Sequence, residues 1–263
     1  MVRAAARRVG LRRHHLSMTR TLCERTALSA VQRRPQVAFG RILCYHSVGT
    51  PEWGVNDVSP ERFRRQLELA LSLGFRFVGA ERVASGDALS NELAVTFDDA
   101  LLSVLHNGAP VMAELGVPWT LFVVTDWAGG RHSSGRRLLM SWKQIRELDR
   151  AGVQIGSHSV THPNFGRIEL QHARSELHDS RQVLADQLGT APDAFAIPFG
   201  QSRDWSVDVM EIAESAGYRR VYAQAAETRP AGTIGRTFIT RFDNDRLFAA
   251  ALRGAFDAWE EWS

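Results

Sequence analysis

The chain has 263 residues, of which 44% are hydrophobic and 23% are charged. This length and composition suffice to build one sizeable buried core. Two cysteines, Cys23 and Cys44, provide no disulfide framework, and no apolar run approaches the length of a membrane-spanning helix. The formal net charge is +3, but residues 1–40 hold nine arginines and one acidic residue, so this segment carries +8 and residues 41–263 carry −5. The basic character belongs to the N-terminal segment, and no nucleic-acid partner is expected.

Residues 1–40 are predicted to form a basic, disordered segment before a single folded domain at residues 41–263. The segment has the basic region of a signal peptide without an apolar core after it, so we do not expect it to act as a signal peptide. Met18 is an alternative start of the chain. We expect a cytoplasmic protein, and peripheral contact of the basic segment with an anionic membrane is the alternative location.

From residue 41 onward, predicted strands and helices alternate along the chain. Ser59 before a proline predicts a helix start, and Ser141 with Gln144 forms a predicted capping box. A longer helix is predicted from residue 168 to 188, with Gly189 as its stop. Because alternating strands and helices favour parallel pairing, we expect an α/β fold with parallel strands. The predicted strands are residues 41–46, 75–79, 93–98, 119–124, 153–158, 194–198, 219–223 and 234–239.

Two aspartates directly follow one of these strands. Residues 93–97 form an apolar, β-rich run, as expected of a strand covered on both faces, and Asp98 and Asp99 come next. Adjacent carboxylates repel each other and are costly to desolvate unless a cation or a proton lies between them. One interpretation is that an aspartate caps a helix beginning near Leu101. The other is that both carboxylates reach one cavity and form part of a cation site.

Two histidines follow another predicted strand. His158 and His162 are spaced i, i+4, but Ser159 follows the first and Pro163 the second, which argues against a zinc-protease helix. They are either polar loop residues or metal ligands. Active-site residues of β/α barrels gather at the C-terminal ends of the strands, so we expect the histidines to meet the aspartates there. Two imidazoles and two carboxylates can hold one divalent metal and leave one carboxylate to move protons.

The ordered set of motifs resembles the polysaccharide deacetylases with a NodB-homology domain, carbohydrate esterase family four. The similarity extends from about residue 41 to about residue 241. The third motif, at residues 195–200, lacks the arginine that the family usually has before the proline. In this respect the chain is closest in pattern to the branch of the family that deacetylates poly-N-acetylglucosamine. Ala100 stands where the family usually has glycine. The motifs are LCYHSV at residues 43–48, TFDD at 96–99, SHSVTHP at 157–163, FAIPFG at 195–200 and AGY at 216–218.

This resemblance implies a single catalytic domain at residues 41–263, folded as a distorted, incomplete (β/α) barrel of about seven parallel strands. It also implies that Asp99, His158 and His162 bind a divalent metal and leave positions for water and substrate. Zn²⁺ is the expected metal, with other divalent transition metals as alternatives.

The resemblance implies further roles in catalysis. Asp98 would be the general base, and a backbone N–H near Phe199 would stabilise the tetrahedral intermediate, with Gly200 allowing the chain to turn. The late histidine that the family often uses as general acid is absent from the last part of the chain. His46 at the end of the first strand is the candidate acid, and a hydrogen-bonded strand-end histidine is the alternative. Trp205 either stacks on a sugar ring or belongs to the core.

We therefore predict a metal-dependent hydrolase that removes N-acetyl groups from a polysaccharide, an oligosaccharide or a glycan precursor. The expected partner is an acetylated amino-sugar glycan or a lipid-linked precursor. Arg236 and Arg241 either orient an acid in the site or are surface charges. One alternative function is hydrolysis of other linear amides on the same fold. Another is a catalytically impaired glycan-binding module.

Overall fold

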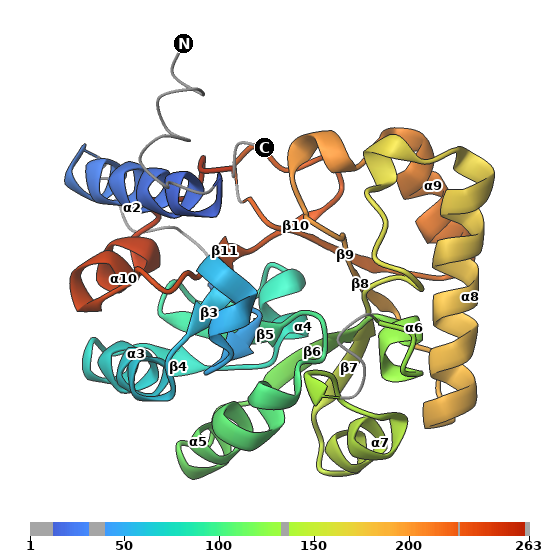
Figure 1. Cartoon of the computed structure of the whole chain (residues 1–263), viewed down its shortest axis with the longest axis horizontal. Coiled ribbons are helices and arrows are strands. Elements are labelled where there is room, and N and C mark those ends of the chain that lie inside the picture. Colours follow the sequence, from blue (N-terminus) through green and yellow to red (C-terminus); the bar gives the residue numbers. More distant parts are fainter. Residues whose placement is uncertain (1–12, 32–39, 133–136, 226, 261–263) are drawn as a thin grey trace.

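The computed structural model describes residues 13–31, 40–132, 137–225 and 227–260 (Figure 1). At its centre is a parallel sheet. The sheet consists of β1 (Arg41–Tyr45), β4 (Arg76–Phe77), β5 (Glu92–Phe97), β6 (Trp119–Val123), β7 (Gln154–Ser157), β8 (Ala194–Ala196), β9 (Arg220–Ala223), β10 (Ile234–Gly235) and β11 (Thr237–Phe238). Its strand order is β10-β9-β8-β7-β6-β5-β1-β11, and β4 pairs with β5 off this path. A separate parallel pair consists of β2 (Ser47–Val48) and β3 (Asp57–Val58).

The sheet closes almost completely into a barrel. Its two end strands, β10 and β11, are separated in the chain by one residue, Arg236, so the ends of the sheet lie next to each other. The predicted distorted, incomplete (β/α) barrel is confirmed, with eight strands along the path rather than about seven. The prediction of a single strand at residues 234–239 is wrong. This segment forms two strands, of which β10 pairs with β9 and β11 pairs with β1.

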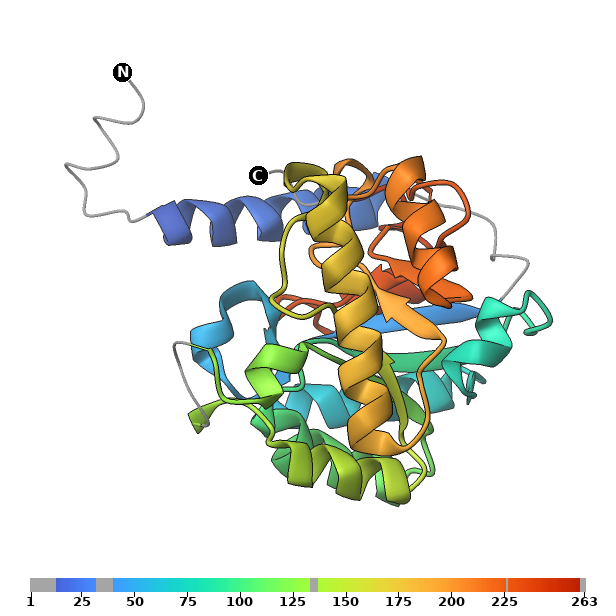
Figure 2. The ribbon, with the colours of Figure 1, turned by 90° about the vertical axis from the view of Figure 1, so that its right-hand side faces the viewer.

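Helices surround the barrel, and Figure 2 shows α8 running along its outside. The predicted start at Ser59 is confirmed, since its side chain accepts a hydrogen bond from the first turn of α3. The capping box of Ser141 and Gln144 and the left-handed stop at Gly189 are also confirmed. The helices are α2 (Arg13–Val31), α3 (Pro60–Ser72), α4 (Ala80–Ala84), α5 (Ala109–Glu114), α6 (Thr125–Ala128), α7 (Trp142–Arg150), α8 (Leu170–Leu188), α9 (Val207–Ala216) and α10 (Asp245–Leu252), with short helical turns at Pro51–Asn56 (η1), Val104–Gly108 (η2), Phe165–Arg167 (η4) and Ser202–Asp204 (η5).

A small apolar cluster lies below the polar groups at the C-terminal ends of β1 and β5. Alternate residues of a strand point to the same face of its sheet. Cys44 therefore lies on the same face as Ile42, and Thr96 and Asp98 lie on the same face as Ala94, each nearer the C-terminal end of its strand. These polar groups are thus placed above the apolar cluster. The cluster consists of Ile42, Ala80, Ala94, Phe122, Ala196 and Tyr222.

Helix α2 is anchored to the C-terminal part of the domain by a buried ion pair. Arg25 is fully buried, and its Nε and Nη2 donate to the two carboxylate oxygens of Asp243 at 2.7 and 2.6 Å. Its guanidinium also lies 3.9 Å from the ring centre of Phe256. The predicted disordered segment is therefore wrong for residues 13–31. Residues 1–12 and 32–39 of that segment lie outside the described residues. None of the described helices is long and apolar enough to cross a membrane.

Candidate active site

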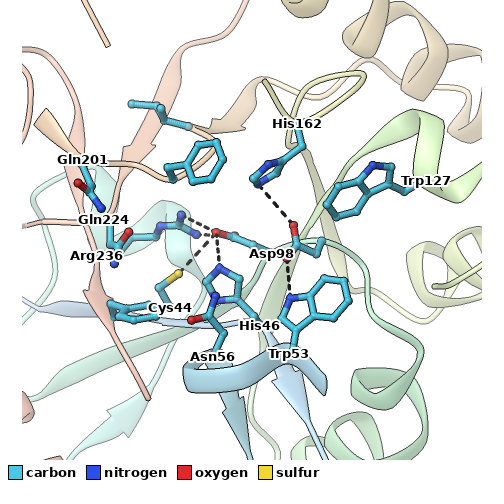
Figure 3. Close-up of a pocket in the computed structure, with 14 residues that line it drawn as sticks. Cys44, His46, Trp53, Asn56, Asp98, Trp127, His162, Gln201, Gln224 and Arg236 are labelled. Carbon is cyan, nitrogen blue, oxygen red and sulfur yellow. Dashed lines mark hydrogen bonds and ion pairs between the residues drawn. The ribbon is translucent and has the colours of Figure 1, made fainter. Parts of the chain in front are cut away.

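A pocket of about 220 Å³ opens where the strands end (Figure 3). It brings together residues from four separate motifs of the sequence. Charged groups lie at its bottom, and aromatic rings form much of its wall. The charged and titratable side chains that line it include Cys44, His46, Asp98, Asp99, His162 and Arg236, and the aromatic ones are Trp53, Trp127, Phe199 and Phe238.

The backbone after β5 turns so that two consecutive carboxylates share this pocket. Asp98 follows the last strand residue directly, and Asp99 and Ala100 have positive φ angles of 71° and 53°. Positive φ is uncommon for residues other than glycine. The glycine that the family usually has at position 100 suits this conformation, and the alanine here adopts it nonetheless.

Asp98 is held as a carboxylate by a buried arginine. Arg236 lies at the junction of β10 and β11, and its Nη1 and Nη2 donate to Asp98 Oδ1 and Oδ2 at 2.7 and 2.8 Å. The Cys44 thiol donates to Oδ2 at 3.6 Å. Burial works to raise the pKa of Asp98, but the charge and hydrogen bonds of Arg236, together with the nearby His158 and His46, outweigh it and hold the pKa well below its usual range. Asp98 is therefore an ionised, fully compensated group.

Among the described residues, Asp99 has no such cationic partner. The indole Nε1 of Trp53 donates to Oδ2 at 3.2 Å, whereas Oδ1 is buried and accepts no hydrogen bond from the described residues. Burial raises the pKa of Asp99 to about 6, and the negative charge of Asp98 adds to the rise. A buried carboxylate oxygen without a partner is costly, so this position favours a bound cation.

Both motif histidines point ring nitrogens at this uncompensated oxygen. His158 Nε2 lies 3.8 Å and His162 Nε2 lies 3.7 Å from Asp99 Oδ1. The Nδ1 of His158 lies 2.8 Å from the carbonyl oxygen of Ala196, an arrangement that leaves Nε2 as the free lone pair. Burial lowers the pKa of His158 to about 3 and that of His162 to about 4. Both imidazoles are neutral at pH 7, as metal ligation requires.

The loop that carries His162 is braced by a buried glutamate. Ser159 and His162 have positive φ angles of 72° and 63°. The carboxylate of Glu176 on α8 accepts from the backbone N–H groups of Val160 and Thr161 at 2.8 and 3.0 Å. The Ser159 hydroxyl accepts from the His162 N–H at 2.9 Å. These bonds fix a tight turn that presents His162 to Asp99.

The three groups fit a divalent metal. One ligand atom each from Asp99, His158 and His162 lies within 4.8 Å of the other two. Two neutral imidazoles and one carboxylate form a donor set that suits zinc and similar ions. The unpartnered oxygen of Asp99 is the observation that favours a cation here.

His46 lies on the other side of Asp98. Its Nε2 is 4.0 Å from Asp98 Oδ2, and its ring packs edge-on against Phe238 with centroids 5.5 Å apart. Its Nδ1 is buried without a hydrogen-bond partner among the described residues. Burial lowers the pKa of His46, against the opposing charges of the aspartates. The predicted acid candidate therefore shares the pocket with the predicted base.

The remaining predicted residues differ in placement. Phe199 is 51% exposed at the pocket wall with φ 64°, and Gly200 follows with φ 66° and a carbonyl that accepts from the Gln224 N–H. Trp205 is only 5% exposed and packs against Phe165 and Phe195. Its predicted stacking on a sugar is thus corrected to a core role.

The sequence analysis missed one side chain of the site and left the roles of two arginines open. Trp53, which contacts Asp99, was missed, because it belongs to none of the motifs and lies 46 residues before Asp99 in the chain. Arg236 orients Asp98, whereas Arg241 donates to the backbone of η1 through its N–H to Val55 O and its guanidinium to Gly54 O. The two arginines that were equivalent in sequence therefore have different functions.

Comparisons with known proteins agree with this geometry. The family model for polysaccharide deacetylases matches residues 85–221. The Bacillus subtilis (strain 168) protein YxkH, whose name places it among the polysaccharide deacetylases, is 23% identical over 183 residues, which cover 68% of this chain and 62% of YxkH. The chain thus matches less than two thirds of that relative.

Solved structures show the same fold. A Streptococcus pyogenes deacetylase, PplD, in complex with acetate superposes with a TM-score of 0.69 at 22% identity, over 83% of this chain and 99% of PplD. IcaB from Ammonifex degensii gives a TM-score of 0.68 at 24% identity, over 82% and 98% of the two chains. The chain belongs to the polysaccharide deacetylase family.

Proposed function

We propose that this protein is a metal-dependent deacetylase that hydrolyses N-acetyl groups of an amino-sugar glycan. The observation that carries the proposal is the contrast between two neighbouring aspartates. Arg236 compensates Asp98 completely, whereas Asp99 leaves a buried oxygen facing His158 and His162. One carboxylate is thereby available for proton transfer and the other for metal ligation.

The proposed reaction breaks the C–N bond of an acetamido group and releases acetate and an amine. A metal held by Asp99, His158 and His162, with Zn²⁺ preferred, would acidify water and polarise the acetyl carbonyl. Asp98 accepts the proton of the attacking water, and its ion pair with Arg236 keeps it ionised for this task.

Two further groups complete the proposed reaction. The backbone N–H near Phe199 would stabilise the charge on the carbonyl oxygen as the tetrahedral intermediate forms. His46 would donate a proton to the leaving nitrogen, because its Nε2 faces the same pocket as Asp98.

The pocket wall supports a sugar substrate. The cavity of about 220 Å³ is small, so it suits the acetamido group of a substrate better than a long substituent. Trp53, Trp127 and Phe199 line its wall, and aromatic faces pack well against the apolar faces of sugar rings. We propose an acetylated amino-sugar polymer, oligomer or lipid-linked precursor as the substrate. The cytoplasmic location and the membrane contact of the basic segment stay predictions.

Acetate release from N-acetylglucosamine oligomers tests the proposal. The purified zinc-loaded protein should release acetate, and Asp98→Asn should retain its metal but lose activity by a factor on the order of a hundred or more. Near-wild-type activity of Asp98→Asn would show that the roles of the two aspartates are wrongly assigned. Oligomer binding without acetate release by the wild type would instead favour the glycan-binding module.

A further inference from the structure

The η1 turn places Trp53 next to the carboxylate of Asp99. This turn precedes the region that the family model matches. The Trp53 Nε1–H donates to Asp99 Oδ2 at 3.2 Å, and Figure 3 shows Trp53 and Arg236 on opposite sides of Asp98. The indole therefore contacts one carboxylate oxygen and leaves the other for the histidines.

The hydrogen bond restricts how Asp99 can bind a metal. The terminal torsion of an aspartate is broad and roughly two-fold, so an unrestrained carboxylate samples many orientations. The bond from Trp53 fixes Oδ2 and leaves Oδ1 at 3.8 Å from His158 Nε2 and 3.7 Å from His162 Nε2. Asp99 is thus presented as a ligand through one oxygen.

The backbone holds Trp53 in place. The Trp53 N–H donates to Thr50 O at 2.9 Å, and the Arg241 N–H donates to Val55 O at 2.9 Å. Gly54, directly after Trp53, has φ 67° and ψ −126°. Few residues other than glycine adopt this conformation. These hydrogen bonds and the conformation of Gly54 therefore fix the position of the Trp53 indole.

A second tryptophan connects Trp53 with the histidine side of the site. The Trp127 ring packs edge-on against Trp53 with centroids 6.5 Å apart, and stacks on His162 at 5.2 Å with an interplanar angle of 24°. The indole of Trp53 is thereby confined on its ring face as well as by its N–H. Its position is fixed relative to the ligands.

We propose that Trp53 is a positioning residue that orients Asp99 as a one-oxygen metal ligand, an assignment that rests on the proposed metal site. Hydrogen-bond partners of metal ligands typically change metal affinity by 10–100-fold when they are removed. Trp53→Phe keeps an aromatic ring in the pocket wall but removes the N–H donor together with the pyrrole part of the indole. We expect this variant to bind zinc about 10–100-fold more weakly than the wild type.

The test measures zinc affinity of the purified full chain by competition with a chelator of known affinity. Wild type, Trp53→Phe, Asp99→Ala and the double variant are compared, and the thermal midpoint of each metal-free protein is recorded. Trp53→Phe should weaken zinc binding with little change in the metal-free midpoint. In the Asp99→Ala background the same substitution should have no further effect, because the carboxylate that it orients is absent.

Three results would overturn the assignment. Equal zinc affinity of wild type and Trp53→Phe would show that the indole does not orient the ligand. An equal loss in the Asp99→Ala background would show that the turn acts through general packing. Absence of zinc binding by the wild type would overturn both the metal site and this assignment. Zinc binding without acetate release would refute the deacetylase function alone and leave the role of Trp53 intact.

Discussion

Replacement of Arg236 by methionine tests the electrostatic basis of the site. Both partners of the Arg236–Asp98 pair are about 2% exposed, and two short hydrogen bonds join them. Arg236 also donates to Thr96 Oγ1 and to Ala223 O, each at 3.3 Å. Methionine preserves an unbranched apolar stem but leaves Asp98 as a buried, uncompensated charge beside Asp99.

The structure sets the size of the effect. Removing one partner of a buried ion pair typically costs about 3–5 kcal/mol of unfolding free energy. For a domain of this length each kcal/mol lowers the thermal midpoint by about 2–4 °C, so Arg236→Met should lower it by on the order of 10 °C. The additional change Asp98→Asn should recover part of the loss, because it removes the unpaired charge.

Thermal and urea unfolding of the metal-free protein provide the measurement. Arg64→Met is the matched control, since Arg64 forms its ion pair with Glu114 on the surface and should change the midpoint far less. A midpoint of Arg236→Met close to that of Arg64→Met would refute the reasoning. Failure of Asp98→Asn to improve Arg236→Met would show that the loss comes from packing rather than from the buried charge.

Two other substitutions test neighbouring features. Arg25→Met should destabilise the full chain by about 3–5 kcal/mol, because it leaves Asp243 buried without its cation; an unchanged urea midpoint would mean that α2 contributes little to the domain. His46→Ala should lower turnover with metal content intact. A proton donor must be protonated and burial lowers the pKa of His46, so the wild-type rate should fall as pH rises through a value below the usual range of histidine. This decrease in rate with rising pH should be weaker in His46→Ala. A pH–rate profile of the variant identical to that of the wild type would make solvent the proton source.

Elements with strong local signals were predictable from sequence. The apolar run before Asp98 marked β5, and the caps at Ser59 and Ser141 marked two helix starts. Residues 234–239 were predicted as one strand because most of them favour strands, although Gly235 does not. The sequence does not indicate that the residues on the two sides of Arg236 pair at opposite ends of the sheet.

The site was predictable to the extent that its residues lie at strand ends. Asp98, Asp99 and His158 follow strands directly, so their convergence could be expected before the structure was known. The contact between Trp53 and Asp99 joins residues 46 positions apart and depends on how η1 folds over the pocket. Trp205 also follows a motif closely in the chain, but it packs in the core. Its exposure could not be predicted, because exposure depends on the tertiary fold.

The metal content of the purified protein tests the central claim most directly. Elemental analysis of the wild type should find about one zinc or similar ion per chain, because Asp99, His158 and His162 form a donor set with an uncompensated oxygen. His158→Ala should lose most of this metal, since it removes one of two imidazole ligands. Equal, near-zero metal in the wild type and in His158→Ala, even after incubation with zinc, would contradict the account.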